Sequence, residues 1–177
     1  MRKSTGSPSI LVFLVVAVLA LASNVSPTAP VVSADTGRER QIREASAAWD
    51  EAFNAANLDQ LMELYAEGAV SMPPGFPALV GKGAIRADFE WFFDNFSSSH
   101  ETRIVDILIS GNLAVEQAEY FQTFTPKDGS DPFTETGKHI EVRMRSGRSW
   151  QIVKEIWNVT PSRAGDVSGG VQSQRRQ

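Results

Sequence analysis

The chain has 177 residues, no cysteine and a formal net charge of −4. The absence of cysteine excludes disulfides, thiolate chemistry and cysteine-based metal sites. An acidic chain with scattered Lys and Arg also lacks the electrostatic footprint of a nucleic-acid-binding protein.

The first 34 residues have the pattern of an export signal followed by a linker. Arg2 and Lys3 precede the apolar run 10–22, which is short for a bilayer span. Small-residue cleavage sites end at Ala22 and at Ala34, and an uncleaved membrane anchor is the alternative. We expect an exported protein, secreted or periplasmic and free of the membrane after cleavage. Loss of Arg2 and Lys3 takes the net charge from −4 to −6.

Helical spacing dominates the chain after the linker. Apolar residues at 42, 45, 49, 53 and 56 predict a first helix, for which Thr36 and Glu39 form a capping box. A short second helix is predicted from Leu58 to Tyr65, and a third follows Gly81. Between these helices a short strand is predicted, because the prolines at 73 and 74 stop a ladder.

Four long strands are predicted in the second half, at 100–110, 113–125, 133–145 and 148–160. Asp128-Gly129 forms the tip of a hairpin loop between the second and third of them. Residues 35–161 are therefore predicted to form one α+β domain, with helices on one face of an antiparallel sheet. The tail 162–177 has little apolar content and is predicted to be disordered.

Three stretches carry a family resemblance: AAWDEAFNAANLDQLMELYAEGAVSMPPG, GKGAIRADF and GKHIEVRMRSGRSWQIVKEIWN. They resemble the nuclear transport factor 2-like superfamily, in particular its SnoaL-like and ketosteroid-isomerase-like branch and the secreted members without an assigned reaction. The resemblance runs from Arg38 to Thr160. It implies a cone-shaped, curved antiparallel sheet wrapped against three N-terminal helices, a pocket at the open end and a dimer interface on the convex face.

This resemblance also sets the expected phase of the last strand. It sends Val153, Glu155 and Trp157 inward. The residues expected on the outer face are Trp150, Ile152 and Ile156. An exposed stripe of Trp and Ile fits burial against a second copy of the chain, so a homodimer through these three residues is expected.

On the same phase, the second strand sends Glu116 and Tyr120 inward, and the third sends Ile140, Val142 and Met144 inward. The resulting pocket is apolar and aromatic, which is typical of a site for a small, mostly apolar molecule. The candidate ligand-binding residues are Trp49, Phe53, Met72, Tyr120, Val142, Met144 and Trp157.

Glu116 and Glu155 are the candidate catalytic residues, because burial and mutual repulsion shift carboxyl pKa values apart. They suit an isomerase, cyclase or dehydratase. The isomerase reaction itself does not carry over, since Trp49, Met72 and Ile140 stand where that family's functional residues fall. The alternative for the two glutamates is a structural role, as a polar pair whose hydrogen bonds are satisfied inside the protein. The alternative for the whole domain is a dimeric association module with a vestigial pocket.

No cofactor and no metal are expected. His139 and Glu141 stand two residues apart and share one strand face, as metal ligands can. A pair at this spacing is weak support for a metal site. We expect them, with Arg143 and Arg145, on a solvated outer face.

Overall fold

The computed structural model describes residues 36–161. The predicted signal segment and C-terminal tail lie outside the described residues. No helix within the described range is long and apolar enough to cross a membrane. The elements are α1 (Thr36–Asn54), α2 (Leu58–Glu63), β1 (Tyr65–Met72), β2 (Leu79–Val80), α3 (Lys82–Asn95), β3 (Phe96–Ser110), β4 (Leu113–Pro126), β5 (Phe133–Ser146) and β6 (Ser149–Val159).

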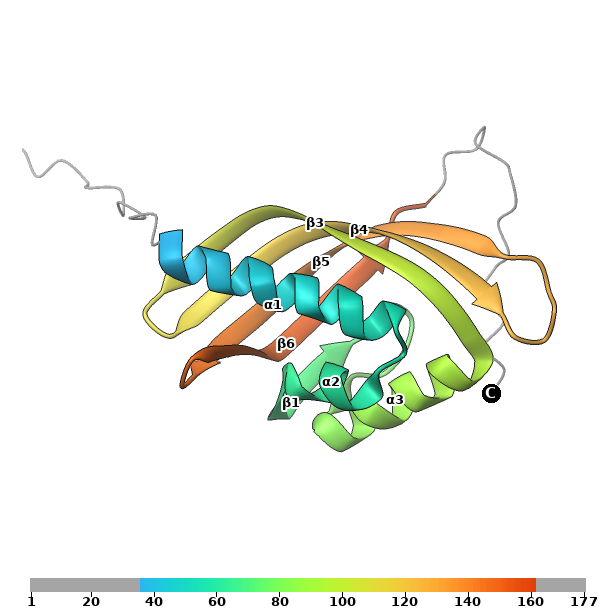
Figure 1. Cartoon of the computed structure of the whole chain (residues 1–177), viewed down its shortest axis with the longest axis horizontal. Helices are drawn as coiled ribbons and strands as arrows, with labels where there is room; N and C mark the ends of the chain where they lie inside the picture. The colour runs from blue at the N-terminus through green and yellow to red at the C-terminus, as the bar shows by residue number, and fades with distance from the viewer. Residues whose placement is uncertain (1–35, 162–177) are drawn as a thin grey trace, which may run out of the picture. The chain divides into compact units, whose positions relative to one another are not determined.

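The strands form a six-stranded sheet in the order β2-β1-β6-β5-β4-β3. All neighbouring strands are antiparallel except β1 and β6, which are parallel. α1 crosses the sheet and packs mainly on β3, whereas α2 and α3 lie beside β1 (Figure 1). The predicted α+β class, with helices packed against a curved sheet, is confirmed.

Two β-bulges contribute to the curvature of the sheet that is visible in Figure 1. The strand pairing skips one residue in β3, Val105, and one in β6, Val153. A bulge bends its strand and increases the local twist. The long strands therefore curve around α1, and we call the face toward the helices the inner face.

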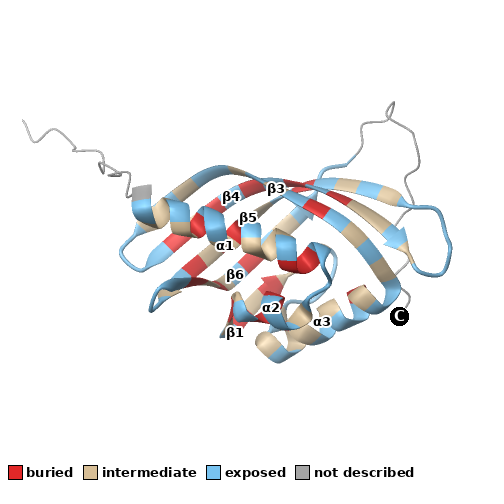
Figure 2. Cartoon of the chain, viewed as in Figure 1, coloured by how far each residue is buried: buried red, intermediate tan, exposed pale blue. Residues whose placement is uncertain are grey.

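The hydrophobic core lies on this inner face in two clusters, and Figure 2 shows buried residues on α1 and along the strands under it. The smaller cluster joins Ile42 of α1 to Ala114 and Trp150 of the sheet. The larger cluster joins all three helices to β1 and β6. Its buried members are Ala52, Phe53, Leu61, Met62, Tyr65, Ala69, Ile85, Phe92 and Ile152.

Side chains of α1 cover the free edge of β3. Asp50 accepts hydrogen bonds from the backbone N–H of Thr102 (2.9 Å) and its hydroxyl (2.8 Å), and lies 2.8 Å from Nδ1 of His100. Asn54 accepts from the His100 N–H (2.6 Å) and donates to its carbonyl (2.8 Å). An uncovered edge strand presents unpaired N–H and C=O groups to other chains. The polar side chains at 50 and 54 satisfy these groups within the domain.

The predicted outward position of Trp150 and Ile152 is wrong. Both belong to the core, with 2% and 0% of their surface exposed. The bulge at Val153 is the reason, because it reverses the alternation of β6. Residues on both sides of the bulge can therefore face inward, and Glu155 and Ile156 do have the predicted phase, buried and exposed respectively.

The predicted phase of β5 is also wrong. His139, Glu141 and Arg143 are on the inner face, whereas Ile140 and Met144 are 37% and 50% exposed. Directly paired residues of neighbouring strands share a face. Glu141 pairs with Glu116 of β4 on one side and with Glu155 of β6 on the other, so all three point inward.

Candidate functional site

A cavity of about 1160 Å³ lies between the helices and the sheet. Aromatic rings from α1, α3 and the strands supply much of its wall. Trp49 stacks on Phe53 at 4.8 Å between ring centroids, and Phe124 stacks on Phe133 at 4.7 Å. The aromatic lining residues are Trp49, Phe53, Phe76, Phe89, Trp91, Phe92, Phe96, Tyr120, Phe124, Phe133 and Trp157.

Polar side chains also line the cavity, and we define five of them on β3 to β6 as the polar patch: His100, Tyr120, His139, Glu141 and Glu155. The imidazole of His100 stacks on the ring of Tyr120 at 5.5 Å, and Tyr120 stacks on His139 at 6.4 Å. The Tyr120 hydroxyl donates to Glu135 (2.7 Å). Burial, followed by this contact with Glu135, raises the pKa of the Tyr120 phenol.

Glu155 is a carboxyl of the patch with a strongly raised pKa. Tyr65 donates its hydroxyl hydrogen to Glu155 (3.0 Å), and the indole N–H of Trp49 donates to the Tyr65 oxygen (3.0 Å). Burial and the charge of Glu141 raise the Glu155 pKa to about 7, although hydrogen bonds from Ser71 and Tyr65 oppose the shift. A carboxyl with such a pKa exchanges its proton near neutral pH, as a general acid or base requires.

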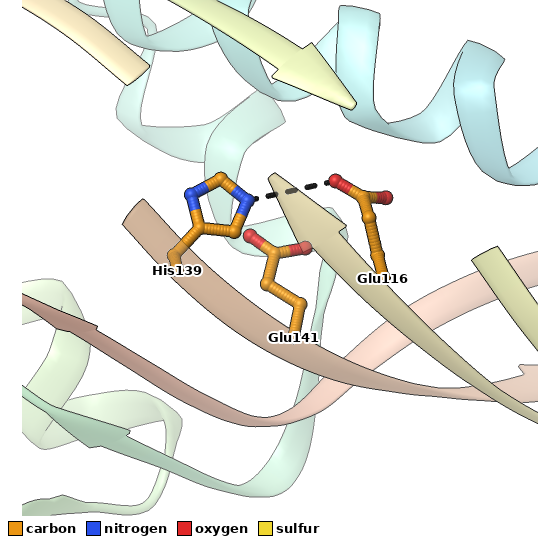
Figure 3. Close-up of side chains that lie close together, drawn as sticks. All are labelled: Glu116, His139 and Glu141. Carbon is orange, nitrogen blue, oxygen red and sulfur yellow. Dashed lines mark ion pairs between the residues drawn. The ribbon is translucent and has the colours of Figure 1, made fainter. Parts of the chain in front are cut away.

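A buried charge cluster lies beside the patch and consists of Glu116, His139, Glu141 and Arg143. Nε2 of His139 is 3.6 Å from Oε1 of Glu116, and Nε of Arg143 is 3.5 Å from Oε2 of Glu116. Nη2 of Arg143 also contacts Oε2 of Glu141. Figure 3 shows the side chains of Glu116, His139 and Glu141 pointing toward one another from β4 and β5.

The pKa shifts in this cluster follow from its geometry. Burial raises the pKa of Glu116, but His139, Arg143 and a hydrogen bond from Ser46 (2.9 Å) outweigh burial and lower it. Burial lowers the pKa of His139, but contact with Glu116 and the charge of Glu141 outweigh burial and raise it. Burial dominates at Glu141, whose pKa is raised despite the nearby Arg143. The cluster therefore favours a protonated imidazole beside an ionised Glu116.

Three residues of the cluster, Glu116, His139 and Glu141, form a group that could hold a metal ion within the described part of the chain. One donor atom each from Glu116, His139 and Glu141 lies within 4.8 Å of the others. Two carboxylates and an imidazole suit a divalent transition-metal ion. The fully buried guanidinium of Arg143 already contacts both carboxylates and supplies positive charge there. The cluster is therefore first of all an internal ion-pair network.

The structure brings most of the predicted site residues to one cavity. Trp49, Phe53, Tyr120, Glu155 and Trp157 line it. Glu116 lies behind the wall, fully buried, and reaches the cavity through its contact with His139.

Three predicted ligand-binding residues do not line the cavity. Val142 and Met144 fall on the other face of β5 because the phase of that strand is reversed. Met72 alternates with Ser71, and it is Ser71 that is buried and lines the cavity. The prediction of these three as wall residues is wrong.

Sequence reasoning placed His139, Glu141 and Arg143 on a solvated outer face, and it assigned no site role to Tyr65, His100 or Asp50. A signal for the β5 residues was present. The hairpin loop 127–132 before β5 and the tight turn after it, with Gly147 at a φ of 62°, fix the strand pairing. That pairing places Glu141 opposite Glu116, so an inward Glu116 requires an inward Glu141.

Comparison with known proteins identifies the family. Residues 46–151 match the SnoaL-like domain, and the chain belongs to this family within the NTF2-like superfamily. No functionally curated protein matches the sequence.

Solved structures share the fold at low sequence identity. A conserved protein from Planctomyces limnophilus has a TM-score of 0.66 at 20% identity, covering 71% of this chain and 99% of that one. A ketosteroid isomerase-like protein from Erwinia carotovora atroseptica has a TM-score of 0.64 at 22% identity, and the match covers 70% of this chain and 96% of that one. A candidate scytalone dehydratase from Novosphingobium aromaticivorans has a TM-score of 0.67 at 15% identity, and the match covers 80% of this chain and 97% of that one.

Proposed function

We propose that this protein is an exported domain that binds a small, mostly apolar molecule in the cavity between its helices and its sheet. The cavity itself carries the proposal: aromatic rings form much of its wall, and the polar patch offers hydrogen-bonding groups to a bound molecule. Sites for small organic molecules have this composition. Export is supported by the N-terminal pattern of Arg2, Lys3 and the apolar run 10–22, and the protein is therefore proposed to act outside the cell or in a periplasm.

A matched pair of variants tests the binding proposal. Gln122 is buried on the inner face of β4 and lines the cavity, whereas the exposed Lys138 of β5 does not. Gln122→Trp should fill part of the cavity and weaken the binding of a hydrophobic fluorescent dye, while Lys138→Trp should leave dye binding unchanged. Equal dye binding by both variants and the wild type would contradict the proposal. N-terminal sequencing of the protein recovered from its producing cells tests export.

An enzyme of the isomerase, cyclase or dehydratase kind is the second candidate. The observation that favours it is Glu155, a cavity carboxyl with a pKa of about 7 that lies one strand away from His139. The ketosteroid isomerase-like and dehydratase designations of two structural neighbours point in the same direction. Turnover that follows the ionisation of Glu155 and is lost in Glu155→Gln, with ligand binding retained, would separate an enzyme from a binding protein.

Homodimerisation remains part of the proposal, but through different residues. Trp150 and Ile152 are core residues and cannot form the interface. Ile156 is 47% exposed and pairs directly with the exposed Ile140 on the outer face of the sheet, where Phe121 is 49% exposed. Exposed apolar surface of this kind is typical of protein–protein contacts. Light scattering of the wild type and of Ile140→Glu tests it, since a monomeric wild type contradicts the proposal. An association module with a vestigial pocket becomes the better reading if the protein dimerises and binds no ligand.

A further inference from the structure

Glu155 differs from the other two buried carboxylates on the inner face in the charge of its partners. Glu116 and Glu141 both contact the guanidinium of Arg143. The hydrogen-bond partners of Glu155 are the hydroxyls of Tyr65 and Ser71, which are neutral. Within the described part of the chain, Glu155 has no ion pair of the kind that Arg143 forms. A buried carboxylate is stable in its charged form only when a positive charge pairs with it.

The cavity that Glu155 lines has more acidic than basic side chains, even with His139 counted as protonated. Of its lining residues, all of which are described, one carries a permanent positive charge: Lys127, whose ammonium group contacts the carbonyl oxygen of Phe93. Seven lining residues carry carboxyl groups. They are Asp88, Asp94, Asp128, Asp131, Glu135, Glu141 and Glu155. A concave site lined by one sign of charge concentrates ligands of the opposite sign.

Aromatic rings lie next to the carboxylate. Trp157 follows Glu155 by two residues on β6, and both side chains line the cavity. Trp49 reaches Glu155 through the Tyr65 hydroxyl and also lines the cavity. Indole rings attract cations through their negatively charged faces, and Trp is the best side chain for this interaction. The wall near Glu155 therefore suits both an apolar body and a positive charge.

We infer that the cavity takes an organic cation, a small and largely apolar or aromatic molecule with an ammonium group that pairs with Glu155. This inference rests on the proposed binding function and specifies the class of its ligand. The ammonium group supplies the positive charge that Glu155 lacks, and the rings surround the rest of the molecule. With a neutral ligand, the direct hydrogen-bond partners of Glu155 would remain the hydroxyls of Tyr65 and Ser71, and the charge of His139 would act on it without direct contact.

Two probes of matched shape test the charge. Benzyltrimethylammonium is cationic at every pH, and neopentylbenzene has the same shape with carbon in place of nitrogen. Their affinities for the purified protein are measured by displacement of a hydrophobic dye and by tryptophan fluorescence. We expect the cation to bind roughly tenfold or more tightly than its neutral counterpart, the factor typical of a desolvated cation beside aromatic rings and a carboxylate.

Variants of Glu155 assign this preference to one residue. Glu155→Gln should reduce the preference to about one, and Glu155→Asp, which retains the charge, should keep most of it. Glu119 is an exposed carboxylate of β4 that does not line the cavity, so Glu119→Gln is the matched control and should behave as the wild type.

The outcomes separate this inference from the proposed function. Equal or tighter binding of the neutral probe, or a preference that survives in Glu155→Gln, overturns the cationic ligand and leaves the binding function standing. Binding of neither probe contradicts both.

Discussion

Glu141 and Glu155 lie directly opposite each other across β5 and β6, and both side chains are buried on the inner face. Like charges in this position repel, and burial deprives them of solvent screening. The arrangement costs stability when both glutamates are ionised. Of these two carboxylates, only Glu141 is in direct contact with the guanidinium of Arg143. Such a cost is common where a protein places polar groups for function.

The first prediction concerns the pH dependence that Glu155 imposes on stability. Its pKa is about 7 in the folded protein against 4.5 for the free side chain. The folded state therefore binds the proton more tightly, and stability falls as pH rises from about 4.5 to about 7. Full ionisation costs about 3 kcal/mol by this difference in pKa. Glu155→Gln should lose this part of the pH dependence and unfold at higher urea than the wild type at pH 8.

Urea unfolding of both proteins between pH 5 and 8 measures the effect. His139, whose pKa is raised, adds stability below its unfolded pKa and loses it as pH rises through its folded pKa, so a slope from His139 should persist in the variant. A Glu155→Gln protein that is less stable than the wild type at pH 8 would show that the carboxylate is a structural anchor.

The second prediction concerns Arg143. Its side chain is fully buried against Glu116 and Glu141. Arg143→Met leaves two buried carboxylates without their shared cation, a change that typically costs about 3–5 kcal/mol. Adding Glu141→Gln to Arg143→Met should recover part of the loss. Denaturant unfolding of the single and double variants measures this coupling, and purely additive effects would show that the contact does not contribute.

The third prediction concerns Gly137, which pairs with Tyr120 across β4 and β5. A Cβ atom added there would overlap the Tyr120 ring and the carbonyl oxygen of Asn158. Gly137→Ala should therefore destabilise the domain by about 1–3 kcal/mol, the usual cost of overpacking, and disturb the cavity wall at Tyr120. Gly83 in α3 has open space around it, so Gly83→Ala is the control and should be neutral or slightly stabilising in thermal unfolding.

The fourth prediction concerns the covered edge of β3. Asp50→Ala removes the acceptor of the Thr102 N–H and hydroxyl groups, which should cost about 1–3 kcal/mol for the groups left unsatisfied. Amide hydrogen exchange at Thr102 should accelerate relative to residues in β4. The exposed neighbour Glu51 provides the control, Glu51→Ala, and unchanged exchange at Thr102 in Asp50→Ala would contradict the role of Asp50.

The sequence predicted the fold because its strongest patterns are local. Helical spacing, Pro73 and the turns between long strands each act over a few residues, and the structure follows them. The inner face of β4 was also predicted, since its burial alternates without interruption from Ala114 to Gln122. The inward orientation of the charged face of β5 was not predicted, because apolar residues normally face the core. Here Ile140 and Met144 face outward while Arg143 is fully buried.

The remaining difference between the predicted and the observed faces lies in β6 and comes from its bulge at Val153. Nothing in the composition of SWQIVKEIWN marks Val153 as an extra residue, because Val is a common strand residue that pairs well on either face. The bulge is defined by the partners on β5 and β1, which are distant in sequence. Local periodicity carries no information about such a skip in pairing.

The bulge at Val153 divides β6 into two segments with different roles. The segment before it supplies Trp150 and Ile152 to the core, and the segment after it supplies Glu155 and Trp157 to the cavity. Substitutions after the bulge therefore change the cavity wall, while Trp150 and Ile152 keep their places in the core. A single unpaired valine thus separates, within one strand, the residues that build the core from the residues that line the cavity.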